Sequence, residues 1–423
     1  MTDTQMGRWP KYYTVVAMCV FAQLLAYFDR VNISVASLAM QETFAWDETT
    51  KGFVLSSFFI GYLAFQVIGG WLANRFGGRT VLGIALISWS IFTFFTPIAA
   101  SVSLSLLIAV RIAMGAGEAS LAPSAFNIFS RWAPEKEKAT IITIFSAAAT
   151  MGTLLALILT GWITQRYGWE MSFYIFGGAG IVLAMCWYKV IYANPTDHPK
   201  ISKQELDLLP KVTEEGKTKG VIPWGQILSS PSVWGLFITY FCTSWGLYVF
   251  IAWLPSYFAA EQGLNISNAG IYSAAPWLSM SIFMVLGGWG SDYLINRGKK
   301  RIVIRKIFGV GGMIGSALTL YLVRDAESAA AAMGLMVVAL AFLSFVYAGV
   351  VPYLMDIAPE HSDILYGFTN TFGTLPGIIG IAIAGWLVQT TGTYDSVFVL
   401  TAGIQIVGGL VFLFICRAGR QVY

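Results

Sequence analysis

The sequence predicts an all-α membrane protein with twelve transmembrane helices, arranged as two pseudo-symmetric six-helix halves around a central cavity. Three observations support this prediction: the composition, the number of long apolar runs and an internal repeat. Hydrophobic residues make up 57% of the 423 residues and charged residues only 11%, whereas soluble domains carry roughly 25% charged residues. This composition excludes an intrinsically disordered chain, a nucleic-acid binder and a secreted disulfide scaffold.

The apolar runs have the length of membrane-spanning helices. A transmembrane helix needs about 20 predominantly apolar residues, whereas the strands of an outer-membrane barrel have only roughly 10. Twelve runs qualify, near 13–37, 52–74, 80–100, 103–129, 138–163, 170–192, 232–259, 268–291, 303–323, 329–354, 364–388 and 396–416.

A polar stretch divides these runs into six and six. Residues 193–231 mix Lys, Glu, Asp, Pro and Gly, which is typical of a linker. We therefore expect an N-terminal six-helix bundle over 1–193, a cytoplasmic linker over 194–231 and a C-terminal six-helix bundle over 232–423.

The basic residues predict the orientation, because Lys and Arg collect on the cytoplasmic side. Of the 26 basic residues, Lys51, Arg166 and Arg324 fall on one side and two fall inside spans, which leaves 21 on the side of both termini. This asymmetry predicts a multi-pass protein of the cell (cytoplasmic or inner) membrane, with both termini cytoplasmic.

An internal repeat relates the two halves. Gly69-Gly70-Trp71 lies at the end of the second run, and Gly287-Gly288-Trp289 lies at the end of the eighth, 218 residues later. Gly161-Trp162 ends the fifth run and Gly385-Trp386 ends the eleventh, 224 residues later. The alternative is that Gly-Trp pairs are simply common at membrane interfaces. The near-equal spacings favour two parallel halves related by an axis along the membrane normal.

Four charged residues lie well inside the spans, where an ionisable side chain is costly and therefore a functional candidate. They are Asp29, Arg30, Arg111 and Glu118. Seven residues turn a helix by two revolutions, so Arg111 and Glu118 project onto nearly one face, roughly 10 Å apart along the axis. Asp29 and Arg30 are adjacent and point about 100° apart.

The four charges fit a binding site for an anion coupled to protons. An Arg fork donates two parallel hydrogen bonds to a carboxylate, so Arg30 and Arg111 suit an anionic substrate. Both His residues fall in loops, so a buried acid must carry the proton, since burial favours the neutral form. We assign this role to Glu118 first and Asp29 second. The alternative is that the four charges only neutralise one another and hold helices together.

Polar residues on the same spans complete the candidate site. Tyr27 lies one turn before Arg30, and Tyr62 and Gln66 are four apart and share a face. Thr369 and Asn370 interrupt a Gly- and Pro-rich part of the eleventh run, which indicates a bendable helix facing the cavity. The alternative reading is small-residue helix packing with Thr and Asn as hydrogen-bonding partners.

At four segments the sequence resembles the anion:cation symporter family of the major facilitator superfamily. That family includes bacterial sugar-acid carriers, sialin, vesicular glutamate carriers and plant phosphate carriers. The resemblance covers nearly the whole chain and is most specific at 27–36, 111–123, 254–257 and 367–380.

The resemblance implies roles for six residues. Arg30 matches an arginine that contacts the substrate carboxylate, and Asp29 matches a carboxylate used in proton coupling. Arg111 and Glu118 match the fourth-span pair, with Glu118 as the protonation site. Tyr62 and Asn370 match cavity residues that bind sugar-acid oxygens.

Two positions depart from members of the family. Thr243 stands where vesicular glutamate carriers hold an arginine, and Ala147-Ala148-Ala149 stands where galactonate carriers place a glutamine. These departures argue against glutamate and galactonate and leave room for a less hydroxylated organic anion.

The predicted function is proton-coupled symport of an organic anion, a sugar acid or other carboxylate, by alternating access. The alternative within transport is sodium-coupled or uncoupled movement of phosphate or another inorganic anion. A receptor would need a larger soluble domain than a loop of about 40 residues, and the ligand sets of a membrane enzyme are missing from the sequence. We expect a monomer in the lipid bilayer, with no cofactor, metal or nucleic acid, whose partners are the carboxylate anion and protons.

Overall fold

The computed structural model describes residues 9–210 and 223–419, and all regular secondary structure in this part of the chain is helical. Twelve of its spans are long and apolar enough to cross a membrane, which confirms the all-α, twelve-helix prediction. The spans are α1 (Lys11–Phe44), α2 (Glu48–Phe76), α3 (Gly78–Val102), α4 (Leu104–Glu118) joined with α5 (Leu121–Trp132), α6 (Lys138–Tyr167), α7 (Trp169–Val190), α10 (Pro231–Ala260), α11 (Ile266–Asn296), α12 (Arg301–Val323), α13 (Ala329–Ile357), α14 (Ser362–Thr391) and α15 (Asp395–Ile415).

The fourth span is broken, although the sequence predicts it as one run. α4 ends at Glu118 and α5 begins at Leu121, with Ala119 and Ser120 between them. Pro123 lacks the N–H that would bond the carbonyl four residues earlier, so the helix is interrupted at that turn. As a result Glu118 is the last residue of α4.

Matching turns mark the two halves of the repeat. Gly77, between α2 and α3, has φ +83°, and Gly298, between α11 and α12, has φ +82°. Gly168 before α7 and Gly392 before α15 have φ +92° and +74°. Backbone in this region favours glycine because other residues clash there, so the repeat extends from sequence to backbone conformation.

The expected linker contains short helices. They are a 3₁₀ turn at Pro195–Asp197, α8 (Lys203–Leu208) and α9 (Trp224–Ser229). Glu205 of α8 is buried and accepts a hydrogen bond of 2.8 Å from the backbone N–H of Tyr12, in the first turn of α1. The contact satisfies an N–H that has no partner within its own helix. Positions 211–222 of the expected linker lie outside the described residues.

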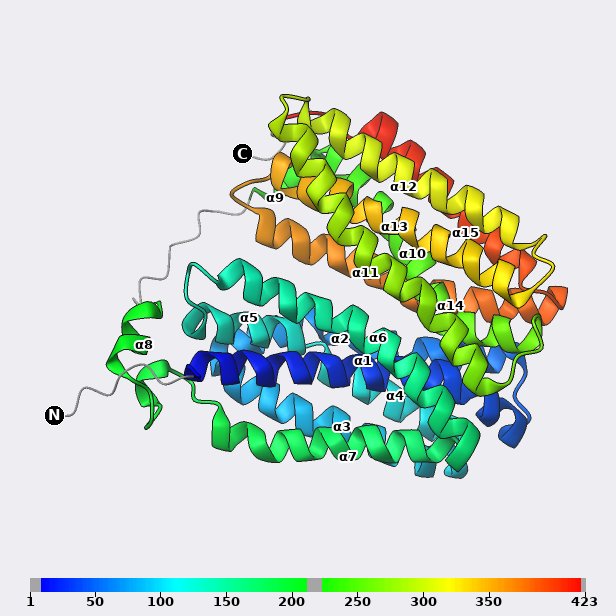
Figure 1. The fold of residues 1–423 in the computed structure, drawn as a ribbon, viewed down its shortest axis with the longest axis horizontal. Coiled ribbons are helices and arrows are strands. Elements are labelled where there is room, and N and C mark those ends of the chain that lie inside the picture. Colours follow the sequence, from blue (N-terminus) through cyan, green and yellow to red (C-terminus); the bar gives the residue numbers. More distant parts are fainter. Residues whose placement is uncertain (1–8, 211–222, 420–423) are drawn as a thin grey trace. The chain divides into compact units, whose positions relative to one another are not determined.

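The chain forms two compact units. The first comprises Met1–Ile33, Ser57–Ala156 and Tyr167–Thr218. Within it α3 packs against α4, α5 and α7, and α3 and α7 run alongside one another in Figure 1.

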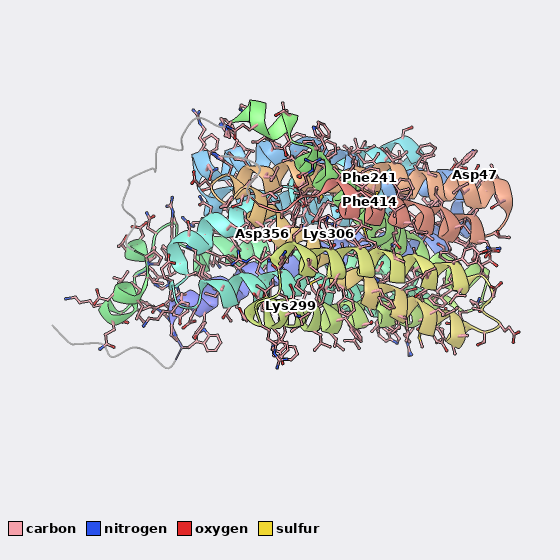
Figure 2. All side chains as sticks on the ribbon, turned by 90° about the horizontal axis from the view of Figure 1, so that it is seen from above. Asp47, Phe241, Lys299, Lys306, Asp356 and Phe414 are labelled. Carbon is pink, nitrogen blue, oxygen red and sulfur yellow. The ribbon has the colours of Figure 1, made fainter. Side chains whose placement is uncertain are left out.

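The second unit comprises Ser34–Ser56, Leu157–Arg166 and Lys219–Tyr423. Within it α12 packs against α13 and α15, and α10 packs against α14 and α15. Figure 2 shows Asp47 at the opposite end of this unit from Lys306 and Asp356. The expected bundle boundaries at 193 and 232 stay a prediction.

Candidate functional site

An ion pair joins α1 and α4 inside the first unit. Arg30 Nη2 donates to Glu118 Oε2 at 3.0 Å, and the two side chains are 8% and 0% exposed. A buried charge is stable only when paired and hydrogen-bonded. The structure therefore brings together two of the four charges singled out from the sequence, and the pair that forms links the first and fourth spans.

Three aromatic rings surround the Arg30 guanidinium. Its Cζ lies 4.7 Å from the ring centroid of Tyr27, 4.9 Å from that of Phe58 and 4.8 Å from that of Tyr62. Aromatic faces attract a cation electrostatically within about 6 Å. The rings surround the guanidinium, and its Nη2 donates to Glu118. Phe58 was missed from sequence, although it continues the 62–66 stripe one turn earlier.

Small residues bring α2 and α4 close enough to build this arrangement. A Cβ added to Gly61 would overlap the Ile112 carbonyl, and one added to Gly115 would overlap the Phe58 carbonyl. Glycines permit such backbone contact because they have no side chain. The close approach places the aromatic residues of α2 beside the charged face of α4.

Arg111 is buried without a direct ionic partner. It is 1% exposed, and no carboxylate of the described residues lies within 4.0 Å of it. Its Nη1 lies 3.5 Å from Met114 Sδ, and its Cζ lies 5.4 Å from the Phe58 ring centroid. A thioether is a weak acceptor. This guanidinium therefore keeps strong donor capacity that an anion can use.

Asp29 is the most enclosed of the four charges. It is 0% exposed, and neither carboxylate oxygen accepts a hydrogen bond from the described residues. Thr93 of α3, Glu118 and Arg111 are its polar and charged neighbours. Asp29 is therefore a fully buried carboxyl of α1 with Glu118 and Arg111 of α4 among its charged neighbours.

The other predicted residues of the first unit lie half-buried. Tyr27 faces Arg30, and a Cβ on Gly152 of α6 would come within 2.8 Å of the Tyr27 Cβ. Gln66 Oε1 is buried and has no hydrogen-bond partner among the described residues. Gln66 therefore keeps an amide oxygen that can accept a hydrogen bond from a ligand.

Thr369 and Asn370 lie on α14, in the second unit. Thr369 is 2% exposed, and its hydroxyl donates to the Leu365 carbonyl at 2.8 Å. The Asn370 side chain is half-buried, and the backbone carbonyl of this residue accepts from the Thr374 hydroxyl at 2.9 Å. The Thr369 hydroxyl is already used by its own helix, which leaves Asn370 as the better donor and acceptor of the two.

Asn127, a further polar residue of the fourth span, has a structural partner. Its Oδ1 accepts from the N–H of Gly78 at 2.8 Å, at the start of α3. This contact caps a helix end, so a polar side chain at this position has a structural role that needs no ligand.

The loop histidine His198 lies outside the spans, against Trp132 and Tyr192, with ring centroids at 6.0 and 4.9 Å. Burial, with Lys11 nearby, lowers the pKa of His198 below its ordinary value, so it is neutral at pH 7. In the described residues no three His, Cys, Asp or Glu side chains gather as a metal site.

The comparison with protein families gives one clear match. The model described as Major Facilitator Superfamily matches residues 19–381. Among solved structures, the bacterial homologue of the human lysosomal transporter Spinster, in an inward-facing and occupied conformation, aligns with a TM-score of 0.80 at 18% identity. That alignment covers 97% of this chain and 98% of the other, which supports the fold.

Curated relatives match almost the whole chain. "Probable anion transporter 4, chloroplastic" of Oryza sativa subsp. japonica is 36% identical, over 96% of this chain and 68% of its own. Two relatives from Arabidopsis thaliana are each 34% identical over 96% of this chain. They are an "Ascorbate transporter, chloroplastic", covered to 75%, and "Sodium-dependent phosphate transport protein 1, chloroplastic", covered to 79%.

These relatives overturn the expected location. The sequence led us to expect a cell (cytoplasmic or inner) membrane, whereas the relatives are named chloroplastic and point to a plastid membrane. The physical reason for the error is that the distribution of Lys and Arg reports how spans are oriented, and it carries no information about which membrane they cross.

Proposed function

Since this chain belongs to the Major Facilitator Superfamily, we propose that it is an anion transporter that moves an organic anion, a sugar acid or other carboxylate, together with protons by alternating access. It is a membrane transporter and not an enzyme. The observation that carries the proposal is the buried pair of arginines: Arg30 is held by Glu118 at 3.0 Å, and Arg111 has no carboxylate within 4.0 Å among the described residues.

The two arginines are the proposed anion clamp. A buried guanidinium without an ionic partner attracts an anion, because its charge is poorly solvated and its fork matches a carboxylate. Arg111 supplies that charge in the resting state. Arg30 adds a second fork once Glu118 is neutral.

Glu118 and Asp29 are the proposed proton carriers. Protonation of Glu118 removes the charge that holds Arg30, and so frees this guanidinium for the substrate. Asp29, fully buried in the same unit, is the second candidate. Release of the anion lets Arg30 pair again with ionised Glu118, which restores the resting arrangement.

The polar side chains support our proposal of an organic rather than an inorganic anion. We assign Tyr27, Tyr62 and Gln66 of the first unit to contacts with substrate oxygens, and Asn370 and Thr369 of α14 to the same role. Neutral hydroxyl and amide groups suit a hydroxylated organic acid. The relative named an ascorbate transporter supports this substrate class.

The second candidate is sodium-coupled or uncoupled transport of phosphate or another inorganic anion. The relative named a sodium-dependent phosphate transport protein favours it. A phosphate group would also use both arginines, so the arginines alone do not separate the candidates.

Two measurements test the proposal. Thermal-shift screening of the purified protein against sugar acids, ascorbate, dicarboxylates, aromatic acids, acidic amino acids and phosphate finds the ligand, since a ligand stabilises the state that it binds. Uptake of the hit into proteoliposomes is then measured with a protonophore, with and without sodium. We expect an organic acid whose accumulation collapses with the protonophore and ignores sodium. Sodium-dependent accumulation of phosphate would contradict the proposal.

A further inference from the structure

Helices α3 and α7 of the first unit, which lie side by side in Figure 1, form a groove on their surface. The groove has a volume of about 280 Å³, and it is lined by Ile87, Ile91, Ile181, Ala184, Met185 and Tyr188. We call it the α3–α7 groove. All its side chains but that of Tyr188 are apolar, and Ile87, Ile91 and Met185 are more than a third exposed. An apolar groove on the surface of two membrane spans suits a hydrocarbon chain.

Small residues bring the two helices together at this groove. A Cβ built on Gly83 of α3 would overlap the Tyr188 ring, and one built on Gly177 of α7 would lie 2.6 Å from the Phe94 backbone nitrogen. Glycines permit such close approach because they have no side chain. Ala184 lines the groove and is only 2% exposed, so a small side chain also lies at its floor.

A guanidinium lies at the Tyr188 end of the groove. Arg79 Nη2 donates to the Tyr188 carbonyl at 3.1 Å, and Arg79 Cζ lies 5.6 Å from the ring centroids of both Tyr188 and Tyr192. The Tyr188 hydroxyl donates to the Thr80 carbonyl at 3.3 Å. Tyr188 therefore belongs both to the groove and to the surroundings of Arg79, so the apolar groove and the cation are continuous.

Arg79 keeps hydrogen-bond donors for an anion. Among the described residues, no carboxylate lies within 4.0 Å of it, and its Nε has no hydrogen-bond partner. A guanidinium carries five N–H donors and matches the oxygens of a phosphate. Arg79 also stands in the first turn of α3, where the helix dipole favours a negative charge.

The charges around this end of the groove are positive. α3 contains no acidic residue, and the single acidic residue of α7, Glu170, lies in its first turn, at the opposite end of the helix from Tyr188. Lys189 follows Tyr188 directly and is exposed. A headgroup with a net negative charge therefore fits better than one that also carries an ammonium.

We propose that the α3–α7 groove and Arg79 form a binding site for one anionic phospholipid. The phosphate binds the Arg79 guanidinium, and an acyl chain lies in the groove. A soluble phosphate compound would use the same guanidinium but would leave the groove without a ligand, so the groove commits the site to a lipid. This inference goes beyond the proposed anion transport and does not depend on it.

Titration of the delipidated protein, followed by native mass spectrometry, tests the site. The probes are phosphatidylglycerol and phosphatidylcholine with the same acyl chains, and glycerol phosphate is the soluble counterpart of the headgroup. Because only phosphatidylglycerol brings a phosphate without a cationic group, we expect it to bind about tenfold more tightly than phosphatidylcholine. Glycerol phosphate at the same concentration should not displace it.

Arg79→Gln tests the contact with the headgroup. Loss of a charge-assisted hydrogen bond should lower the affinity for phosphatidylglycerol about tenfold, to that for phosphatidylcholine. Arg75→Gln is the matched control, because Arg75 is also a cation beside two rings, Trp71 at 5.3 Å and Phe76 at 5.7 Å, but does not adjoin the groove. Arg79→Lys keeps the charge without the planar fork, so its affinity should lie between those of the unmodified protein and Arg79→Gln; it decides the matter if Arg79→Gln does not fold.

Ile181→Trp tests the contact with the acyl chain. The larger side chain fills part of the groove, so the affinity for phosphatidylglycerol should fall about fivefold, through the loss of buried apolar area. Val182→Trp is the matched control, since Val182 is the next residue of α7, is 55% exposed and does not line the groove. Its affinity should equal that of the unmodified protein.

Equal affinities of the unmodified protein for the two lipids would overturn the proposal, as would equal affinities of Arg79→Gln, Arg79→Lys and Arg75→Gln for phosphatidylglycerol. Displacement of the lipid by glycerol phosphate would assign the site to a soluble phosphate and overturn it too. Equal affinities of Ile181→Trp and Val182→Trp would contradict an acyl chain in the groove. The titration needs no transported anion, so its failure leaves the proposed function in place. A protein that binds phosphatidylglycerol as expected but accumulates no organic acid would refute that function alone.

Discussion

The interiors of the first six and last six spans differ in charge although their turns repeat. The first six enclose Asp29, Arg30, Arg111 and Glu118, with an ion pair of 3.0 Å between α1 and α4. In the described helices α10 to α15, charged side chains stand only near helix ends. The repeat thus preserves backbone conformation at Gly77 and its counterparts and does not preserve the chemistry of the interior.

The polar groups inside the last six spans are neutral, and several hydroxyls bond to the backbone of their own helix. Thr243 donates to the Thr239 carbonyl at 2.8 Å, and Thr369 donates to the Leu365 carbonyl at 2.8 Å. These groups cannot change charge. The comparison supports our proposal that ion coupling belongs to the first six spans and that the last six contribute neutral contacts.

The largest expected effect comes from Arg111→Gln. This change removes the buried cation that has no direct ionic partner among the described residues. Loss of one member of a buried charge–carboxylate contact costs roughly 2–5 kcal/mol, so initial uptake into proteoliposomes should fall about 100-fold. Arg111→Lys keeps the charge but lacks the planar fork, so its initial uptake should lie between that of the unmodified protein and that of Arg111→Gln. Uptake by Arg111→Gln within a factor of about two of the unmodified protein would show that the charged half does not bind the anion.

Asn370→Ala tests the neutral contacts proposed for the last six spans. Loss of one hydrogen bond to substrate costs about 1–1.5 kcal/mol, so the KM for transport should rise about fivefold to tenfold. The dependence of uptake on the proton gradient should stay unchanged, because Asn370 carries no charge. A change in proton dependence at this position would break the division of roles between the halves.

Thr369→Val should have the smallest effect. The hydroxyl is 2% exposed and bonded to its own helix, and the Leu365 carbonyl keeps its helical partner when the hydroxyl is removed. We expect KM and the maximal rate to change by less than about twofold. A larger rise in KM, measured beside Asn370→Ala, would place this hydroxyl in contact with substrate and correct our interpretation.

Much of the fold was predictable because membrane spans are set by apolar length alone. The twelve runs correspond to twelve spans, and only local interruptions were missed. The break at Ala119 and Ser120 depends on which neighbouring groups bond the backbone carbonyl that Pro123 leaves without its helical partner. The short helix α8 depends on the contact between Glu205 and Tyr12. Neither contact can be read from one segment of sequence.

The candidate site was predictable as a set of residues but not as a set of contacts. Helical periodicity gives the face of each charge, and cost in the membrane singles out the four charged residues. Neither argument shows which helices are neighbours. The pairing of Glu118 with Arg30 rather than Arg111 therefore emerged only from the structure. Phe58 was not predicted, because in the sequence a phenylalanine within a span cannot be told from a lipid-facing residue.

The most direct test of the charged half is Glu118→Gln, assayed in proteoliposomes for both proton-driven accumulation and counterflow exchange of the screened organic acid. Glutamine keeps the size of the side chain and a hydrogen-bonding oxygen but cannot bind and release a proton. Glu42→Gln, an exposed position, is the control. We predict that accumulation by Glu118→Gln is abolished while counterflow continues; accumulation equal to that of the control would contradict the assignment of proton coupling to this carboxylate.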